Sequence, residues 1–250
     1  MDTLVNDSDS DSNSDERSAR GLARNTPSEK DVENVRHLLR TLLPLELVDL
    51  AIEYAEYWPC LHSESPFRVR FEAEAAPGLK IAYCYLLSLP IPNVSTRKGL
   101  QIPQVKRIEI HLQSHDQGWA THSGPWFEAT IVQDAGESRP KWLNAALNYP
   151  LDLSLARADF QQVFAADNLR WHIASNQVAN RATQHHSVVW TKQEADGPKD
   201  AESSKGREGL GHELVRALKP GDRVAILALA EQWGWENHVE SGSIDIYYSV

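Results

Sequence analysis

The sequence predicts a mainly β protein: an antiparallel, jelly-roll-like β-sandwich that follows an α-helical hairpin and a disordered acidic N-terminal tail. Short segments that alternate apolar and polar residues recur from residue 67 to the end of the chain, as in half-buried strands. Pro- and Gly-containing turns separate several of these segments. Many short strands joined by turns are typical of sandwiches and jelly rolls. We expect the tail at residues 1–26, the hairpin at 27–62 and the sandwich at 63–250, with a flexible insertion at 192–211.

The composition limits the kinds of partner. The chain of 250 residues has a net charge of −10, and a phosphate-binding surface needs basic residues, so we expect no nucleic-acid partner. We expect no membrane partner, because no apolar run approaches the roughly 20 residues that span a bilayer. The N-terminus has no signal-peptide pattern, and Cys60 and Cys84 have no metal-binding spacing. We therefore expect a cytoplasmic or nuclear protein with reduced thiols and no cofactor, and the oligomeric state stays open.

The N-terminal tail is acidic and poor in apolar residues. Residues 1–16 carry six acidic residues and no basic one, a composition that predicts disorder because it buries too little apolar surface. A solubilising tail is one interpretation. Ser8 and Ser12 each have an acidic residue three positions later, so a phosphorylated switch is the other.

Residues 28–58 have apolar residues at helical spacing, in two runs. Ser28 is the predicted N-cap of the first helix, with Asp31 in its first turn. Pro44 begins the second helix and Pro59 ends it. The predicted apolar faces are Val35, Leu38, Leu39 and Leu42 in the first helix, and Leu47, Leu50, Ala51, Tyr54 and Trp58 in the second. This hairpin has two apolar faces and must pack against something.

Residues 43–47, Leu-Pro-Leu-Glu-Leu, resemble the opening of an F-box, a family whose role is to dock a ubiquitin-ligase scaffold. The resemblance covers about one helix. Ala51 stands where the family usually carries a large aliphatic residue, and strand-like sequence near Phe67 replaces the remaining F-box helices. The alternative is a helical cap that packs on the β-domain.

The β-domain is predicted strand by strand. Alternating or continuously apolar segments indicate strands at residues 67–73, 79–89, 107–112, 126–132, 169–174 and 186–191. Residues 133–168 form an excursion between strands.

The C-terminal part predicts a β-hairpin. Its first strand is residues 214–218, and its second is residues 223–230. Pro220 and Gly221 occupy the central positions of a type II turn between them, since Pro presets φ and Gly accepts a positive φ. A loop at 231–242 leads to a last strand at 243–250.

Several motifs together resemble a group of filamentous-fungal proteins. They are Ser-His-Asp-Gln-Gly-Trp at 114–119, Trp126-Phe127, Gly-Asp-Arg at 221–223 and Gly-Trp-Glu-Asn at 234–237. In that group a Leu-Pro-x-Glu-Leu helix ending in Tyr-Trp-Pro, here residues 57–59, precedes a β-domain. The resemblance covers roughly residues 35–250. It implies a cytosolic protein with this domain order, and it carries no activity.

The candidate ligand site joins two polar, aromatic loops, one after the strand at 107–112 and one before the last strand. Indole rings stack on the C–H faces of sugars, and carboxylate and amide groups take pairs of hydroxyls. The predicted ligand-binding residues are Asp116, Gln117, Trp119, Trp126, Trp235 and Asn237. The alternative is that Asp116 and Asn237 hold their own loops and that the tryptophans fill the core.

Metal and catalytic sites have weaker patterns. His111, His115 and His122, with His185 or His186, are the candidate zinc or iron ligands, but H-x-x-x-H spacing suits a helix and here falls on a strand and its exit loop. We therefore expect no metal. Asp116 with His115 or His172 is the candidate acid/base pair. No nucleophile elbow, phosphate loop or facial triad accompanies it, so no catalytic residue is assigned.

Three functions follow. The first is non-catalytic recognition of a small polar ligand, such as a glycan or glycosylated metabolite, or of a protein segment, through loops at one end of the sandwich. The second is a ubiquitin-ligase adaptor acting through the F-box-like helix. The third is a cavity-type lyase, cyclase or isomerase of fungal secondary metabolism, because such enzymes leave little trace in a sequence.

Overall fold

The computed structural model describes residues 26–72, 81–92, 103–119, 124–133, 169–193, 207–230 and 234–250. Almost all of the predicted acidic tail at 1–26, almost all of the excursion at 133–168 and most of the insertion at 192–211 lie outside these residues. No helix in the described part is long and apolar enough to cross a membrane.

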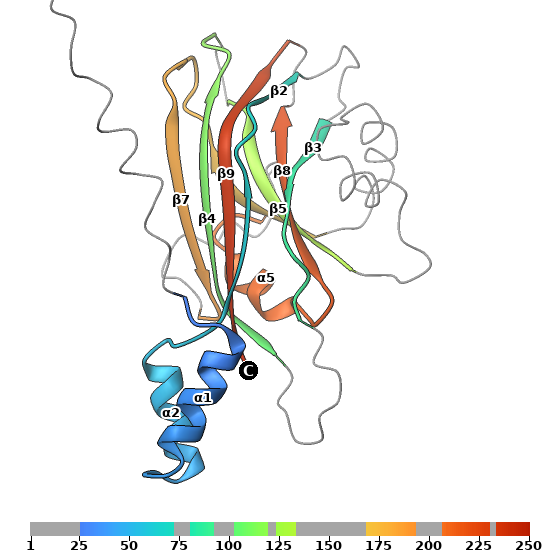
Figure 1. Ribbon diagram of the computed structural model, residues 1–250. Helices are drawn as coiled ribbons and strands as arrows, with labels where there is room; N and C mark the ends of the chain where they lie inside the picture. The colour runs from blue at the N-terminus through green and yellow to red at the C-terminus, as the bar shows by residue number, and fades with distance from the viewer. Residues whose placement is uncertain are drawn as a thin grey trace, which may run out of the picture.

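Two antiparallel sheets form a β-sandwich, as the sequence predicts (Figure 1). The five-stranded sheet has the order β1-β9-β4-β7, with β2 also paired to β9, and the four-stranded sheet has the order β3-β8-β5-β6. If β2 is set aside, this is the strand order of a jelly roll, in which the chain passes repeatedly between two four-stranded sheets. The strands are β1 (Cys60–Ser65), β2 (Val69–Glu72), β3 (Ile81–Leu87), β4 (Gln104–Asp116), β5 (Trp126–Val132), β6 (Arg170–Ser175), β7 (Gln184–Thr191), β8 (Arg223–Ala230) and β9 (Glu236–Ser249).

The core lies between the two sheets. Strand β4 alternates buried and less buried residues from Arg107 to Gln113, so Ile108, Ile110 and Leu112 face inward. They meet inward-facing residues of the other strands, among them Phe127, Ala129, Ile226, Ile244 and Ile246. Between residues 108 and 112 of β4 the interior is therefore apolar, and the polar side chains of the alternate positions lie on the outer face of the five-stranded sheet.

Strands β4 and β9 are longer than predicted. The sequence predicts that β4 ends near residue 112 and that a loop at 231–242 precedes the last strand. In the structure β4 continues to Asp116, and β9 begins at Glu236 and pairs with it along nearly its whole length. These loop predictions were wrong because Asp116 and Asn237 are polar residues that face inward, and this breaks the expected alternation.

The segment before β8 is a helix and not the predicted strand. Helix α5 (Gly211–Ala217) buries Leu214 and Val215 and lies against β4, β6 and β7. A short apolar run fits either structure, so tertiary packing decided this one. The predicted turn that follows is confirmed: the Asp222 N–H donates to the Lys219 carbonyl at 3.0 Å, and Gly221 has φ +89°.

The helical hairpin is confirmed, although its buried face differs from the prediction. Helix α1 (Glu29–Leu39) begins at a Ser28–Asp31 capping box, and α2 (Leu45–Tyr54) begins after Pro44. The small core between them consists of Val32, Val48 and Ile52, with Leu39, Tyr57 and Val250 packed against it. The hairpin projects from one end of the sandwich, beside the C-terminus (Figure 1).

Candidate functional site

Asp116, the central residue of the first predicted loop, is fully buried and binds backbone N–H groups. Its Oδ1 accepts from Gly118 at 2.6 Å and from Asn180 at 3.0 Å, and its Oδ2 accepts from Ala179 at 2.6 Å. A carboxylate with three backbone donors holds the end of β4 against the turn between β6 and β7. Both of its oxygens are therefore used within the fold.

Asn237, the central residue of the second predicted loop, links the two sheets. Its Nδ2 donates to the Trp126 carbonyl at 3.2 Å, and its Oδ1 accepts from Asn176 at 3.0 Å. The Asn176 Oδ1 in turn accepts from Ser114 at 2.6 Å and contacts His186 Nε2 at 3.0 Å. This buried network joins β4, β5, β7 and β9, and burial lowers the pKa of His186.

The two predicted loops do meet. The Gln117 side chain donates to the Trp119 carbonyl at 2.5 Å and accepts from the Glu236 N–H at 3.1 Å. Trp119 also lies beside Gly234, where a Cβ would be 3.4 Å from its Cη2 atom. The six predicted ligand residues thus gather at one end of the sandwich.

Only one of these six residues offers its side chain to solvent. Trp119 is 53% exposed, whereas Asp116, Gln117, Trp126, Trp235 and Asn237 are all buried. The indole of Trp126 donates to Glu128 at 2.8 Å, and Trp235 packs against Ala230. The geometry therefore favours a structural role for five of the residues and leaves Trp119 as the one in position to touch a ligand.

The predicted metal and acid/base residues do not converge on one centre. The His115 ring stacks on His238 with centroids 4.5 Å apart, and its Nδ1 donates to the Asp116 carbonyl. His186 faces the buried network, and His172 contacts Ser175 Oγ at 3.0 Å. His122 lies outside the described residues. Among the predicted ligands that the structure describes, His111 alone joins a group suited to a metal.

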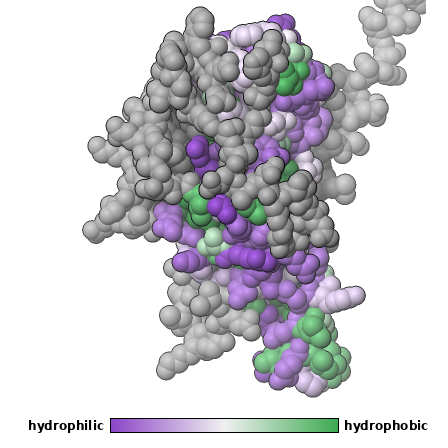
Figure 2. All heavy atoms as spheres, turned by 180° about the vertical axis from the view of Figure 1, so that it is seen from behind, coloured by the Kyte–Doolittle hydropathy of each residue, from purple (hydrophilic) through white to green (hydrophobic). Residues whose placement is uncertain are grey.

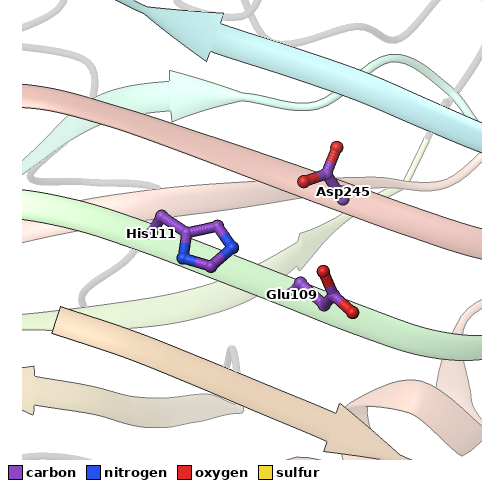
Figure 3. A group of neighbouring side chains, drawn as sticks. All are labelled: Glu109, His111 and Asp245. Atoms are coloured by element: carbon purple, nitrogen blue, oxygen red, sulfur yellow. The ribbon is translucent and has the colours of Figure 1, made fainter. Parts of the chain in front are cut away.

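That group lies on the outer face of the five-stranded sheet. Glu109, His111 and Asp245 each offer one ligand atom, and the three atoms lie within 4.8 Å of one another (Figure 3). Asp245 on β9 is opposite Glu109 on β4, and His62 on β1 is opposite Asp245 on its other side. His62 Nδ1 lies 2.7 Å from Asp245 Oδ1.

The sequence contains a partial signal for this group. Inward-facing Ile244 and Ile246 place Asp245 on the outer face, and Ile108 and Ile110 do the same for Glu109. No pattern along the chain shows that β4 and β9 pair in this register. The proximity of the two carboxylates could therefore not be predicted from the sequence.

A groove of about 370 Å³ opens on the same outer face. It lies over β1, β4, β7 and β9, and most of the residues that line it are polar. Among the lining residues are Glu64, His111, Gln113, His185, Ser241 and Ser243. The groove shares His111 with the carboxylate group.

The hairpin carries a second candidate surface, which we call the hairpin stripe: Leu47, Leu50, Ala51 and Tyr54 on α2. Leu47, Leu50 and Tyr54 are 49%, 61% and 91% exposed, while Val48 and Ile52 on the other side of α2 are buried. Leu38, Leu42, Leu43 and Leu45 are exposed as well. Figure 2 shows a hydrophobic area at the tip of the hairpin.

Polar contacts attach the hairpin to the end of the sandwich. Lys106 pairs with Glu53 at 2.7 Å, and Arg107 pairs with Glu56. Arg36 of α1 donates to the Val250 carbonyl at 2.5 Å, and its pair with Asp49 of α2, at 3.1 Å, joins the two helices. These contacts involve the side of the hairpin that faces the sandwich, so the hairpin stripe stays uncovered in the described part of the chain.

No protein-family model matches the chain, and no curated protein matches it.

Proposed function

We propose that this protein is a non-catalytic adaptor whose hairpin docks a partner protein through the hairpin stripe. The observation that carries the proposal is the division of α2 into two apolar faces. Val48 and Ile52 fill the hairpin core, and a second set at i, i+3, i+4 and i+7 faces solvent. Grooves that take an amphipathic helix use this same spacing.

The free energy available from burying the hairpin stripe supports its use as a binding surface. Single exposed apolar residues are ordinary, but a contiguous apolar patch on a soluble protein marks an interaction site. Burying a Leu or aromatic side chain contributes about 1.5–3 kcal/mol. Leu47, Leu50 and Tyr54 together can therefore supply several kcal/mol to a complex, against the entropic cost of association.

The proposed partner is the ubiquitin-ligase scaffold subunit that binds F-box helices. Residues 43–47 resemble the start of an F-box, and the structure leaves Leu43, Leu45 and Leu47 of that segment exposed. Helix α2 carries acidic residues and no basic one, which suits an apolar groove with a basic rim. In this proposal the β-sandwich holds the target.

The test is a titration of the purified full chain with that scaffold subunit, followed by calorimetry. We expect a one-to-one complex. We expect the Leu47→Glu/Leu50→Glu variant to bind at least about a hundredfold more weakly, because it lacks two leucine side chains that the complex would bury. Leu89→Glu is the matched control, since Leu89 lies on the sandwich and, like Leu47, is 49% exposed. Absence of binding by the wild type, or equal binding by the double variant, overturns the proposal.

A second candidate function is recognition of a small polar ligand, and the polar groove favours it. Serine, histidine, glutamine and glutamate side chains line this groove, and they can pair with the hydroxyls of a glycan. The test compares glycan-array binding by the wild type and a Gln113→Ala/His185→Ala variant, since both residues are exposed in the groove. Wild-type binding that the variant loses supports this function, and an identical profile for both proteins removes it.

A further inference from the structure

We propose that Glu109, His111 and Asp245 bind one divalent transition-metal ion, of the Zn²⁺ class, on the outer face of the five-stranded sheet (Figure 3). The site is independent of the proposed function of the hairpin. It lies at a central position of the sheet, between two long paired strands.

Sheet geometry places the three ligands on rigid backbone. Asp245 on β9 is the direct cross-strand neighbour of Glu109 on β4, and His111 follows two residues later on the same face of β4. Their ligand atoms already lie within 4.8 Å of one another. Tetrahedral zinc, with bonds of about 2.0–2.2 Å, needs its ligand atoms about 3.5 Å apart, so rotation of the partly exposed His111 and Glu109 side chains suffices to close the site.

The neighbours of both carboxylates orient them. His62 Nδ1 lies 2.7 Å from Asp245 Oδ1, and Arg107 Nε lies 3.0 Å from Glu109 Oε1. The first contact is a hydrogen bond and the second an ion pair. Ligating carboxylates in metalloproteins usually have polar partners, which hold the ligand and tune its basicity. Cys60 Sγ lies 3.7 Å from Asp245 Oδ1, so a soft ligand is also near.

Charge and burial favour a cation at this place. The Asp245 side chain is 0% exposed, and like charges directly across a strand pair repel each other. A metal ion between Asp245 and Glu109 turns this repulsion into attraction for both carboxylates. One imidazole with two carboxylates suits zinc, and also manganese and iron, better than an all-oxygen calcium cage does.

The site leaves one coordination position open. Three protein ligands and a free position are the arrangement of zinc sites that bind water or a further ligand. His111 also lines the polar groove, so the proposed metal site adjoins that groove through this residue.

The experiment uses the full chain without an affinity tag, freed of metal by a chelator and titrated with Zn²⁺ in a calorimeter. We expect one saturable site. Glu109→Gln and His111→Ala are the test variants, because both side chains are partly exposed and their loss leaves the core intact. Each is expected to weaken binding by at least about tenfold.

His185→Ala is the matched control, since His185 is an exposed histidine on the same face and is not part of the group. It is expected to bind Zn²⁺ like the wild type. Visible absorption of Co²⁺ in place of Zn²⁺ gives a second readout, with tetrahedral bands that Glu109→Gln and His111→Ala lose. Absence of saturable binding, or wild-type affinity in both test variants, overturns the site.

Discussion

Asp116 and Asn237 are directly opposed across the β4–β9 pair, and both side chains point into the sandwich. Asp116 holds the turn between β6 and β7, and Asn237 holds β5 and a neighbouring asparagine. This end of the sandwich is therefore closed by buried hydrogen bonds. A ligand site at this end would have to use Trp119 and the surface around it.

Replacement of Asp116 by Asn is expected to destabilise the fold. The amide has one acceptor oxygen in place of two, so at least one buried backbone N–H loses its partner, at a cost of about 1–3 kcal/mol. Urea denaturation measures the free energy of unfolding. Glu64→Gln is the control, because Glu64 is an exposed carboxylate and its change should stay within about 0.5 kcal/mol of wild type. Equal stability of both variants would contradict the structural role of Asp116.

Two adjacent residues of α2 should respond differently to truncation. Val48 is fully buried in the hairpin core, so Val48→Ala should cost about 1–3 kcal/mol of hairpin stability. Leu47 faces solvent, and Leu47→Ala should change stability by less than about 0.5 kcal/mol. Amide hydrogen exchange of residues 29–54 reports the difference. A large effect of Leu47→Ala would show that the hairpin stripe is covered within the protein.

The two thiols should differ in reactivity. Burial raises the pKa of the Cys84 thiol to about 12, so at pH 8 almost none of it is the reactive thiolate. Cys60 lies on the outer face beside Asp245. We expect a thiol reagent to modify one cysteine of the native protein and both after denaturation, with Cys60→Ser abolishing the native reaction. Mass spectrometry checks the site of modification, and fast labelling of Cys84 in the native state would contradict this prediction.

Zinc should slow the labelling of Cys60. The Cys60 thiol lies 3.7 Å from Asp245 Oδ1, so an ion bound at the proposed site hinders the approach of the reagent to the thiol. The rate with Zn²⁺ is compared with the rate after chelation, in the wild type and in His111→Ala. Protection in the wild type and not in the variant is the expected result. Equal protection in both would place the zinc elsewhere.

Two glycines matter for different reasons, which Ala substitution separates. Gly221 has φ +89°, and a Cβ added there would meet no atom within 4 Å, so Gly221→Ala costs only backbone strain, about 1–2 kcal/mol. A Cβ on Gly211 would lie 2.2 Å from Trp190 Cδ1, so Gly211→Ala must displace the indole. Thermal unfolding should show the larger loss for Gly211→Ala, together with altered tryptophan fluorescence that Gly221→Ala does not show.

The sequence by itself determined those elements whose signals are local. The bounds of β5 and β8 match the predicted 126–132 and 223–230, because each is a short apolar-rich run with clear ends. The Ser28 capping box and the Pro220–Gly221 turn depend on residues within four positions of one another. Such interactions act before the chain collapses, so the sequence pattern reports them directly.

Tertiary structure decided the rest. Leu214 and Val215 became helical because α5 packs against three strands, and β1 was missed because its residues alternate only weakly in hydrophobicity. Asp116 and Asn237 could be strand residues only because buried partners satisfy their polar groups. Glu109 and Asp245 meet because β4 and β9 pair in one register across the chain. That register depends on the burial of apolar faces from distant segments, and no local pattern encodes which segments meet.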